Sequence, residues 1–430
     1  MALALLISAS VAYAVGYAMF KNRRVESISL AILDILQSVP ILGFFPVVLY
    51  AFTNIPLVGL EAAAVFLIFT SMAWNMIFGV YQSFKTIPGD YFAMSQIYLK
   101  SLEDAHLLVP AALRSLVYNA TVSWGNAFFF ITSSEVITLG SEVKLFGIGS
   151  LVVEAFEKND YLTAYVGITL GILGNMAVYS IFRRLSNVVD IPPRLSSYVA
   201  TWMRWGRYVV LSISATILLL FLTNLSVPAL PPGKFLEAAS ASMFSTWRVL
   251  AVLAIGLAVG VTAAAVVTEK PSREGAVFYG TAFLSSIPPA FLYPLLAMFI
   301  SGEALAVALL ASGSVVYIVM NTVAAWRDIP RDFTKAYNIS GGLYLIHVLL
   351  PSTLPYLTTG LLTAWGGAWN ATIAAEPLAG VWGIGAYMAK ATDRGDLEGV
   401  STALVVMVGI VLAVNRLLWK RLYRWASQWV

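Results

Sequence analysis

The chain has 430 residues, a formal net charge of +4 from 26 Lys and Arg against 22 Asp and Glu, and a mean hydropathy of +0.82. Hydrophobic residues make up 59% of the chain and charged residues only 11%, whereas a water-soluble domain carries about 25% charged residues. This composition excludes a water-soluble protein and favours a membrane protein. The small net charge does not point to nucleic-acid binding.

Eleven apolar stretches are long enough to cross a bilayer, whose hydrocarbon core of about 30 Å requires roughly 20 helical residues. They cover about residues 1–20, 27–51, 57–82, 108–134, 161–182, 208–227, 249–268, 275–300, 303–325, 348–374 and 401–419. The first stretch has no basic residue before it, so we do not expect a cleavable signal peptide. The sequence therefore predicts an all-α integral membrane protein with about 11 transmembrane helices.

The basic residues are unevenly divided between the two sides of these spans. With the N-terminus outside and the C-terminus in the cytoplasm, the cytoplasmic loops hold 19 of the 26 Lys and Arg residues. The outer loops hold six, namely Lys144, Lys158, Lys234, Arg248, Lys390 and Arg394. Because cytoplasmic loops are enriched in Lys and Arg, this bias supports both the number of spans and the orientation.

The sequence also contains an internal repeat. The stretches that begin at Pro110 and Pro351 align without a gap at an offset of 241. Other matches pair Ser38-Val-Pro40 with Ser286-Ile-Pro288, Ile87-Pro88-Gly-Asp90 with Ile329-Pro330-Arg-Asp332, Trp124-Gly125 with Trp365-Gly366, Glu135 with Glu376, and Gly147-Ile-Gly149 with Gly383-Ile-Gly385. Shared Pro, Trp, Gly and Glu cannot arise from apolar composition alone, so the matches indicate a duplication.

The duplication predicts the domain organisation. Residues 1–184 form a first repeat of five spans, and residues 246–430 form a second. The linker 185–245 contains one extra span, at about 208–227, which gives both repeats the same orientation in the membrane. Two parallel bundles related by a pseudo-two-fold axis along the membrane normal are one way to enclose a central pathway.

Each repeat has a polar insert, at about 83–107 and 326–347, between its third and fourth spans on the cytoplasmic side. We expect short helices from Asp90 to Asp104 and from Asp332 to Leu345. Pro88 and Pro330 precede them and suit a first helical turn, in which an aspartate can cap the exposed N–H groups. The inserts are therefore either capped surface helices or rigid contact points for another protein.

These motifs resemble a known family. Ser-[Val/Ile]-Pro in one span, Ile-Pro-x-Asp at the start of a cytoplasmic helix and a Leu-x-Pro-like step into the next span are similar to binding-protein-dependent ABC transporter permeases. The Trp-Gly, Glu and Gly-Ile-Gly that follow resemble the nitrate/sulfonate/taurine branch, in a duplicated and fused form. The resemblance implies the fold of a type I ABC importer permease in a prokaryotic cell membrane.

The resemblance also implies a role for the inserts. In this family the cytoplasmic insert carries a Glu-Ala-Ala signature and docks on an ATPase subunit. Here the signature is reduced to Ala93 in the first repeat and Ala336 in the second, and the glycine that usually follows corresponds to Gly341 or Gly342 in the second repeat alone. We therefore expect ATPase coupling through Pro88, Asp90, Ala93, Pro330, Asp332, Ala336, Gly341 and Gly342.

The sequence contains no phosphate-binding loop, no thiolate metal site and too few histidines for a His-rich metal site. The phosphate-binding motif G-x-x-x-x-G-K-[ST] is absent, so ATP and Mg²⁺ are expected on a partner ATPase, and no catalytic residue, cofactor or metal is expected on this chain. Cysteine is absent, and there are only two histidines. His106 and His347 occupy equivalent positions, and a polar anchor at the membrane surface is favoured over ATPase contact or pH sensing.

Glu135 and Glu376 lie within or at the outer end of equivalent spans. Carboxylates there usually face the interior of a helix bundle, so both are candidates for a pathway or gate. Because bare carboxylates would repel an anion, hydrogen bonds that hold the gate together are favoured over contact with the solute. The other candidates are Ser38, Pro40, Trp124, Ser286, Pro288 and Trp365, with packing between helices as the alternative.

Together these features predict the permease subunit of an ATP-driven ABC importer for a small solute, and the resemblance implies that this solute is an anion. The expected partners are an ABC ATPase dimer in the cytoplasm and an extracytoplasmic solute-binding protein. The alternative is a secondary transporter or channel driven by an ion gradient, with Glu135, Glu376 and Asp34 as ion sites. An intramembrane enzyme ranks far below both, because no paired acids, Ser/His pair or metal-binding set occurs.

Overall fold

The computed structural model describes residues 1–38, 40–53, 59–98, 107–137, 145–186, 212, 230–285, 287–325, 329, 334, 336–337 and 339–426. Within these residues the chain is helical, with no β-strand. Clustering of contacts divides it into two compact units, which are described separately. Unit 1 comprises residues 1–37, 45–131 and 169–227, and unit 2 comprises residues 38–44, 132–168 and 228–430.

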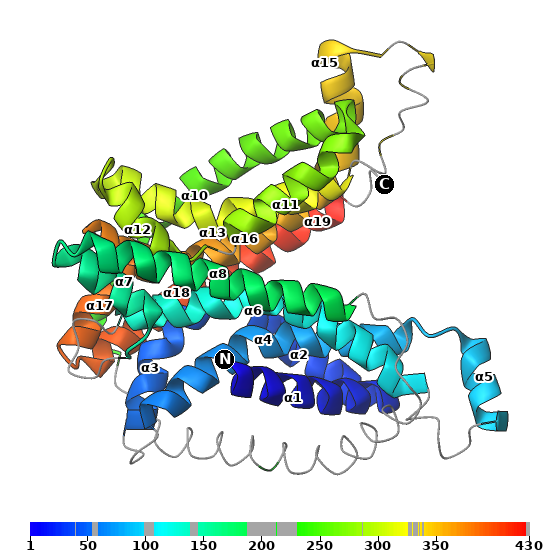
Figure 1. The fold of residues 1–430 in the computed structure, drawn as a ribbon, viewed down its shortest axis with the longest axis horizontal. Helices are drawn as coiled ribbons and strands as arrows, with labels where there is room; N and C mark the ends of the chain where they lie inside the picture. Colours follow the sequence, from blue (N-terminus) through cyan, green and yellow to red (C-terminus); the bar gives the residue numbers. More distant parts are fainter. Residues whose placement is uncertain are drawn as a thin grey trace. The chain divides into compact units, whose positions relative to one another are not determined.

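The first repeat contains eight described helices (Figure 1). They are α1 (Ala2–Lys21), α2 (Arg23–Ser38), α3 (Ile41–Thr53), α4 (Gly59–Lys85), α5 (Gly89–Tyr98), α6 (Val109–Ile137), α7 (Ile148–Glu157) and α8 (Tyr161–Ser186). In unit 1, α1 packs along α4. Met19, Met72 and Phe84 are among the fully buried side chains of this unit's core.

The second repeat lies in unit 2 (Figure 1). Its helices are α10 (Pro232–Glu269), α11 (Glu274–Ser285), α12 (Pro289–Ala297), α13 (Gly302–Ala324), α15 (Gly341–Tyr344), α16 (Leu350–Ala379), α17 (Ile384–Asp393), α18 (Leu397–Val414) and α19 (Lys420–Ala426). Helix α13 packs along both α10 and α16. Gly256 and Gly260 of α10 both face Ile318 of α13. Small residues at these positions let the two membrane helices approach closely.

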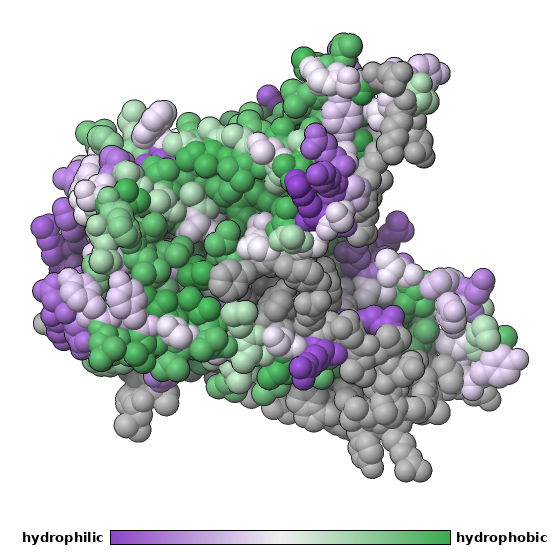
Figure 2. Space-filling model, turned by 45° about the horizontal axis from the view of Figure 1, so that its top comes forward, coloured by the Kyte–Doolittle hydropathy of each residue, from purple (hydrophilic) through white to green (hydrophobic). Residues whose placement is uncertain are grey.

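Seven helical stretches in the described part of the chain are long and apolar enough to cross a membrane. They are α1, α4, residues 161–182 of α8, α10, α13, residues 341–379 and residues 397–419. Helix α6 matches the predicted span 108–134 in position but is not one of the seven. Apart from residue 212, the predicted span 208–227 lies outside the described residues. Hydrophobic residues cover most of the described surface on the face shown in Figure 2, as expected for contact with lipid.

Two predicted spans are not continuous helices. The stretch 27–51 divides into α2 and α3 around Pro40, and the stretch 275–300 divides into α11 and α12 before Pro289. Proline lacks a backbone N–H and disfavours helical geometry in the residue before it, so a helix tends to stop there. Pro288 and Pro289 instead serve as the N-cap and first residue of α12.

Unit 2 combines segments from both repeats. Helix α7 of the first repeat packs against α12 of the second, where the rings of Phe156 and Tyr293 meet edge to face at 5.7 Å. The backbone N–H of Leu42 donates to Oδ1 of Asn370 in α16 at 3.0 Å. These contacts join parts of the chain that are far apart in sequence. The domain boundaries near residues 184 and 246 stay predictions.

Candidate functional site

Glu135, near the end of α6, binds the first turn of the short helix α7. Its Oε2 accepts hydrogen bonds from the backbone N–H groups of Gly149, at 2.7 Å, and Ser150, at 3.3 Å. The first N–H groups of a helix have no partner within the helix, and their partial positive charge favours a carboxylate. The buried side chain of Glu135 therefore acts as a cap supplied by a neighbouring helix.

Glu376, near the end of α16, occupies the equivalent position in the second repeat. Its Oε2 accepts from the backbone N–H of Gly385 in α17 at 2.8 Å, and its Oε1 accepts from the hydroxyl of Ser245 in α10 at 2.7 Å. The side chain is fully buried. Both repeats thus use one carboxylate to hold the start of a ten-residue helix.

The repeated Gly-Ile-Gly has a steric explanation in this arrangement. A Cβ atom added at Gly147 or Gly383 would lie 2.0 or 2.3 Å from the nearest carboxylate oxygen of Glu135 or Glu376. A Cβ at Gly385 would lie 2.1 Å from the carbonyl oxygen of Thr372. The glutamate and the two glycines of each repeat therefore form one structural motif, which we call the carboxylate cap.

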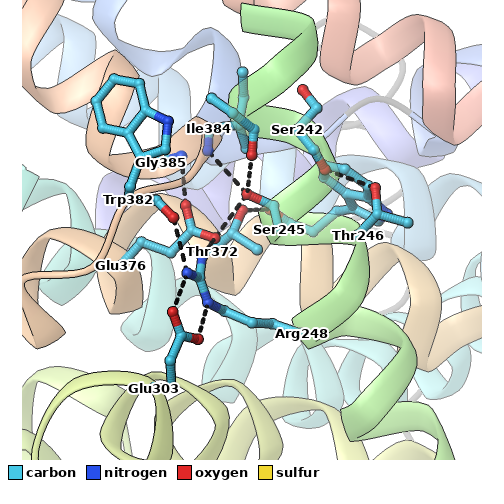
Figure 3. A network of polar contacts seen from close by, with 12 residues as sticks. Ser242, Ser245, Thr246, Arg248, Glu303, Thr372, Glu376, Trp382, Ile384 and Gly385 are labelled. Atoms are coloured by element: carbon cyan, nitrogen blue, oxygen red, sulfur yellow. Dashed lines mark hydrogen bonds and ion pairs between the residues drawn. The ribbon is translucent and has the colours of Figure 1, made fainter.

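Arg248 of α10 joins the second carboxylate cap to two further segments (Figure 3). Its Nη1 donates to Oε1 of Glu376 at 2.7 Å. Its Nε and Nη2 each donate to one carboxylate oxygen of Glu303, at the start of α13, at 2.7 Å. Nη2 also donates to the carbonyl oxygen of Trp382, in the turn before α17, at 2.8 Å. One guanidinium thus connects α10, α13, α16 and the α16–α17 turn.

Ser245 completes this network from one turn earlier on α10. Its hydroxyl donates to Glu376 and accepts from the backbone N–H of Ile384 at 2.8 Å. Arg248 is only 1% exposed, so its charge is compensated inside the protein by carboxylates.

Arg248 and Lys234 lie in a helix and not in a loop as predicted, while the prediction that they lie on the outer side of the membrane stays a prediction. Helix α10 begins at Pro232, not near residue 249, so both residues lie within a helix of 38 residues. The residues before 249 include several serines and charged residues, which lower the apolar character of the sequence without ending the helix. The available signal was the spacing of Ser245 and Arg248, which places both on one helical face.

The predicted pathway candidates do not gather into one described site. Glu376 and Trp365 lie on the same helix, 11 residues apart, which corresponds to about 16 Å along its axis. The buried ring of Trp365 packs on Trp369 and Trp419, and the partly buried ring of Trp124 packs on Phe182. Pro40 and Pro288 are buried. The side chain of Ser38 and all of Ser286 lie outside the described residues. The pathway role of these residues stays a prediction.

The first cytoplasmic insert contains helix α5, which is described from Gly89 to Tyr98. The rest of the helix predicted up to Asp104 lies outside the described residues. Pro88, Asp90 and Ala93 are exposed. Phe92 lies against the core of unit 1, where its ring stacks on that of Phe20 at 5.6 Å. The opposite side of α5 exposes several large apolar side chains, namely Tyr91, Met94, Ile97 and Tyr98.

The second insert is described only in part. Pro330, Asp332 and His106 of the first insert lie outside the described residues. Ala336 is helical and exposed. The continuous helix expected up to Leu345 is interrupted at residues 339–340, where Gly341, with a φ of +61°, starts α15 anew. Gly342 follows in α15, and His347 is exposed.

Comparison with known families identifies both repeats. The family described as "Binding-protein-dependent transport system inner membrane component" matches residues 4–191 and again residues 256–430. The chain belongs to this family. It is a multi-pass membrane permease in which the family's domain occurs twice, as the internal repeat predicts.

Several individual permeases are similar to parts of the chain. The nitrate import permease protein NrtB of Leptolyngbya laminosa is 33% identical over 138 residues, which is 31% of this chain and 50% of the relative. The bicarbonate transport system permease protein CmpB of Synechococcus elongatus is 30% identical over 153 residues, 34% of this chain and 53% of the relative. The putative aliphatic sulfonates transport permease protein SsuC of Escherichia coli is 31% identical over 149 residues, 33% of this chain and 57% of the relative. The chain thus spans about half the length of these relatives.

Proposed function

We propose that this permease is the membrane subunit of an ATP-driven importer for a small anion. The observation that carries the proposal is the presence of two copies of the permease domain on one chain. Two copies supply the two halves that an importer needs around its pathway. The names of its relatives refer to nitrate, bicarbonate and aliphatic sulfonates, and small oxyanions are the solute class common to them.

The exposed side of α5 supports a docking role for the first insert. Tyr91, Met94 and Ile97 point away from the core that holds Phe92. Large apolar side chains that remain exposed together favour a protein partner. On the side that the basic residues assign to the cytoplasm, we propose that this partner is an ATPase subunit, with the second insert docking on its twin.

ATP and Mg²⁺ then belong to the ATPase, because this sequence has no phosphate-binding loop. The permease contributes the pathway and the movement that changes access to it. On the opposite face we propose that a solute-binding protein delivers the anion. Because the guanidinium of Arg248 is buried and bound to two carboxyl groups, we propose that the anion site lies elsewhere in the pathway.

Reconstitution tests this proposal. The chain is placed in proteoliposomes with the ATPase and the solute-binding protein from the same genome, and uptake of labelled nitrate, bicarbonate and an aliphatic sulfonate is measured. We expect uptake only when ATP and all components are present. Uptake by the permease alone that an uncoupler abolishes would instead identify an ion-gradient-driven transporter.

Variants of α5 test the docking role. Met94→Asp and Ile97→Asp place charges on its exposed apolar side, and should weaken co-purification of the ATPase and ATP-dependent uptake together. Leu162→Asp is a matched control, because Leu162 is 77% exposed but lies at the start of α8, which the basic residues assign to the outer side of the membrane. Equal loss with Leu162→Asp would contradict docking on α5.

A further inference from the structure

Helices α10, α13 and α16 and the α16–α17 turn meet at Arg248. The two carboxylate partners of Arg248 differ sharply in solvent exposure. Glu376 is 0% exposed, whereas the side chain of Glu303 is 63% exposed. Both carboxylates lie 2.7 Å from the guanidinium. Contacts of equal length can therefore differ greatly in the free energy needed to break them.

The contact with Glu376 belongs to a buried network. Besides Arg248, Glu376 accepts from Ser245 and from the N–H of Gly385, and Ser245 also holds the N–H of Ile384. Separation of Glu376 from Arg248 would leave a buried charge without compensation, which is strongly unfavourable. This side of the network therefore holds α10, α16 and the start of α17 together as one group.

The contact with Glu303 is different because water already reaches the carboxylate. Glu303 is the second residue of α13, and its two hydrogen bonds described here both come from Arg248. Exposed ion pairs contribute little to stability because water replaces the lost contact. Arg248 would keep Glu376 and the carbonyl of Trp382 as partners. The arrangement can thus open at Glu303 without disrupting the buried group.

We propose that Arg248 and Glu303 form a releasable latch between the start of α13 and the group made by α10, α16 and the α16–α17 turn. The latch closes this end of the second repeat, which the basic residues assign to the outside, and opens during transport. Arg248 is thus a positioning residue of the gate and not a ligand of the anion. This inference rests on the proposed importer function for its role, but the contact itself can be tested on the permease alone.

The absence of cysteine in the sequence makes the test direct. Ala306 lies one turn after Glu303, on the same side of α13, and is fully buried. Ala306→Cys therefore introduces a single thiol that maleimide can reach only when the start of α13 separates from its neighbours. The rate of labelling in the purified full-length permease measures this opening.

Three variants are compared in the Ala306→Cys background. Glu303→Gln should raise the labelling rate about two- to fivefold, the range expected for loss of a partly exposed ion pair. Arg248→Lys keeps the charge but loses the planar fork and should also raise the rate. Lys234→Gln is the matched control, because it breaks the ion pairs with Asp396 and Glu398 in the same unit and should leave the rate unchanged.

Several results would overturn the latch. One is an unchanged labelling rate with Glu303→Gln, and another is an equal rise with Lys234→Gln. A fall in unfolding temperature with Glu303→Gln as large as that with Glu376→Gln would show a purely structural contact. In the complete ATP-driven complex, labelling of Ala306→Cys should differ between nucleotide-free and vanadate-trapped states. Equal labelling in a complex that transports would contradict the latch and leave the proposed function intact.

Discussion

The two carboxylate caps bind the start of a short helix in the same way but lie in different surroundings. In both, a glutamate near the end of a long helix binds the first N–H groups of the next, short helix. In the second repeat the glutamate also binds Arg248 and Ser245 of α10. What the repeats share is therefore the position of a short helix, and in the second repeat the structure also describes a charged connection from the glutamate to two more helices.

The charged connection in the second repeat comes from the N-terminal part of α10. This helix has 38 residues and packs on α13. Its N-terminal part carries both Ser245 and Arg248. The carboxylate cap is therefore a local motif that needs only the glutamate and the glycines of its own repeat. The charged network of the second repeat depends on a neighbouring helix, α10.

The largest expected effect is the loss of Glu376. Glu376→Gln leaves the buried guanidinium with one fewer charged partner, and breaking a buried ion pair costs about 3–5 kcal/mol. We expect a marked fall in unfolding temperature, measured by fluorescence of the purified permease during heating. For the hydrogen bonds described at Glu135, the amide oxygen of Glu135→Gln would still accept from the helix N–H groups, and the expected cost is about 1 kcal/mol. Equal losses would break the comparison.

Substitution of a cap glycine should also destabilise the second repeat more than the first. Gly385→Ala places Cβ 2.1 Å from the carbonyl oxygen of Thr372, whereas Gly149→Ala places it 2.8 Å from that of Thr132. Overpacking of this kind costs about 1–3 kcal/mol, with the larger cost at Gly385. Gly366→Ala is the control, since no atom lies within 4 Å of its Cβ, and alanine in a helix should slightly stabilise the protein. Destabilisation by all three to the same degree would remove the steric explanation.

The sequence revealed the caps only as a pattern. Glu135 with Gly147-Ile-Gly149 and Glu376 with Gly383-Ile-Gly385 could be matched because residues of distinct chemistry recur at fixed spacing. The spacing could not show that the glycines make room for the carboxylate. That requires the end of one helix to face the start of the next, which tertiary packing decides.

Arg248 could not be placed from sequence because its partners are remote. Glu303 and Glu376 lie 55 and 128 residues away in the sequence. A search for apolar stretches also ends a predicted span at charged residues, so it places Arg248 outside the membrane. The breaks before Pro40 and Pro289 were missed for a related reason. Proline is tolerated inside membrane helices, as Pro46 and Pro294 are in α3 and α12, so its presence alone does not locate a break.

The smallest expected effect is on the pH dependence of stability, and it concerns the turns that follow α7 and α17. Asp160 accepts from the hydroxyl and N–H of Thr163 at the start of α8, and these hydrogen bonds lower the pKa of Asp160. Asp396 caps α18 through the N–H of Gly399 and pairs with Lys234 at 2.6 Å. Burial acts to raise the pKa of Asp396, but the bonds from Lys234 and Gly399 outweigh it, so this pKa is also lowered.

A lowered pKa means that each aspartate stabilises the fold above its ordinary pKa of about 3.9, and that this stabilisation is lost as the pH falls through the lowered value. Asp160→Asn and Asp396→Asn should each reduce the fall in unfolding temperature between pH 7 and pH 3. Added NaCl should weaken the contribution of Asp396 more than that of Asp160, because only the former depends on a charged partner among the contacts described here. Lys234→Gln should remove the salt dependence at Asp396 and leave Asp160 unaffected. An equal response of both aspartates to salt would mean that the second repeat's charged connection does not extend to this turn.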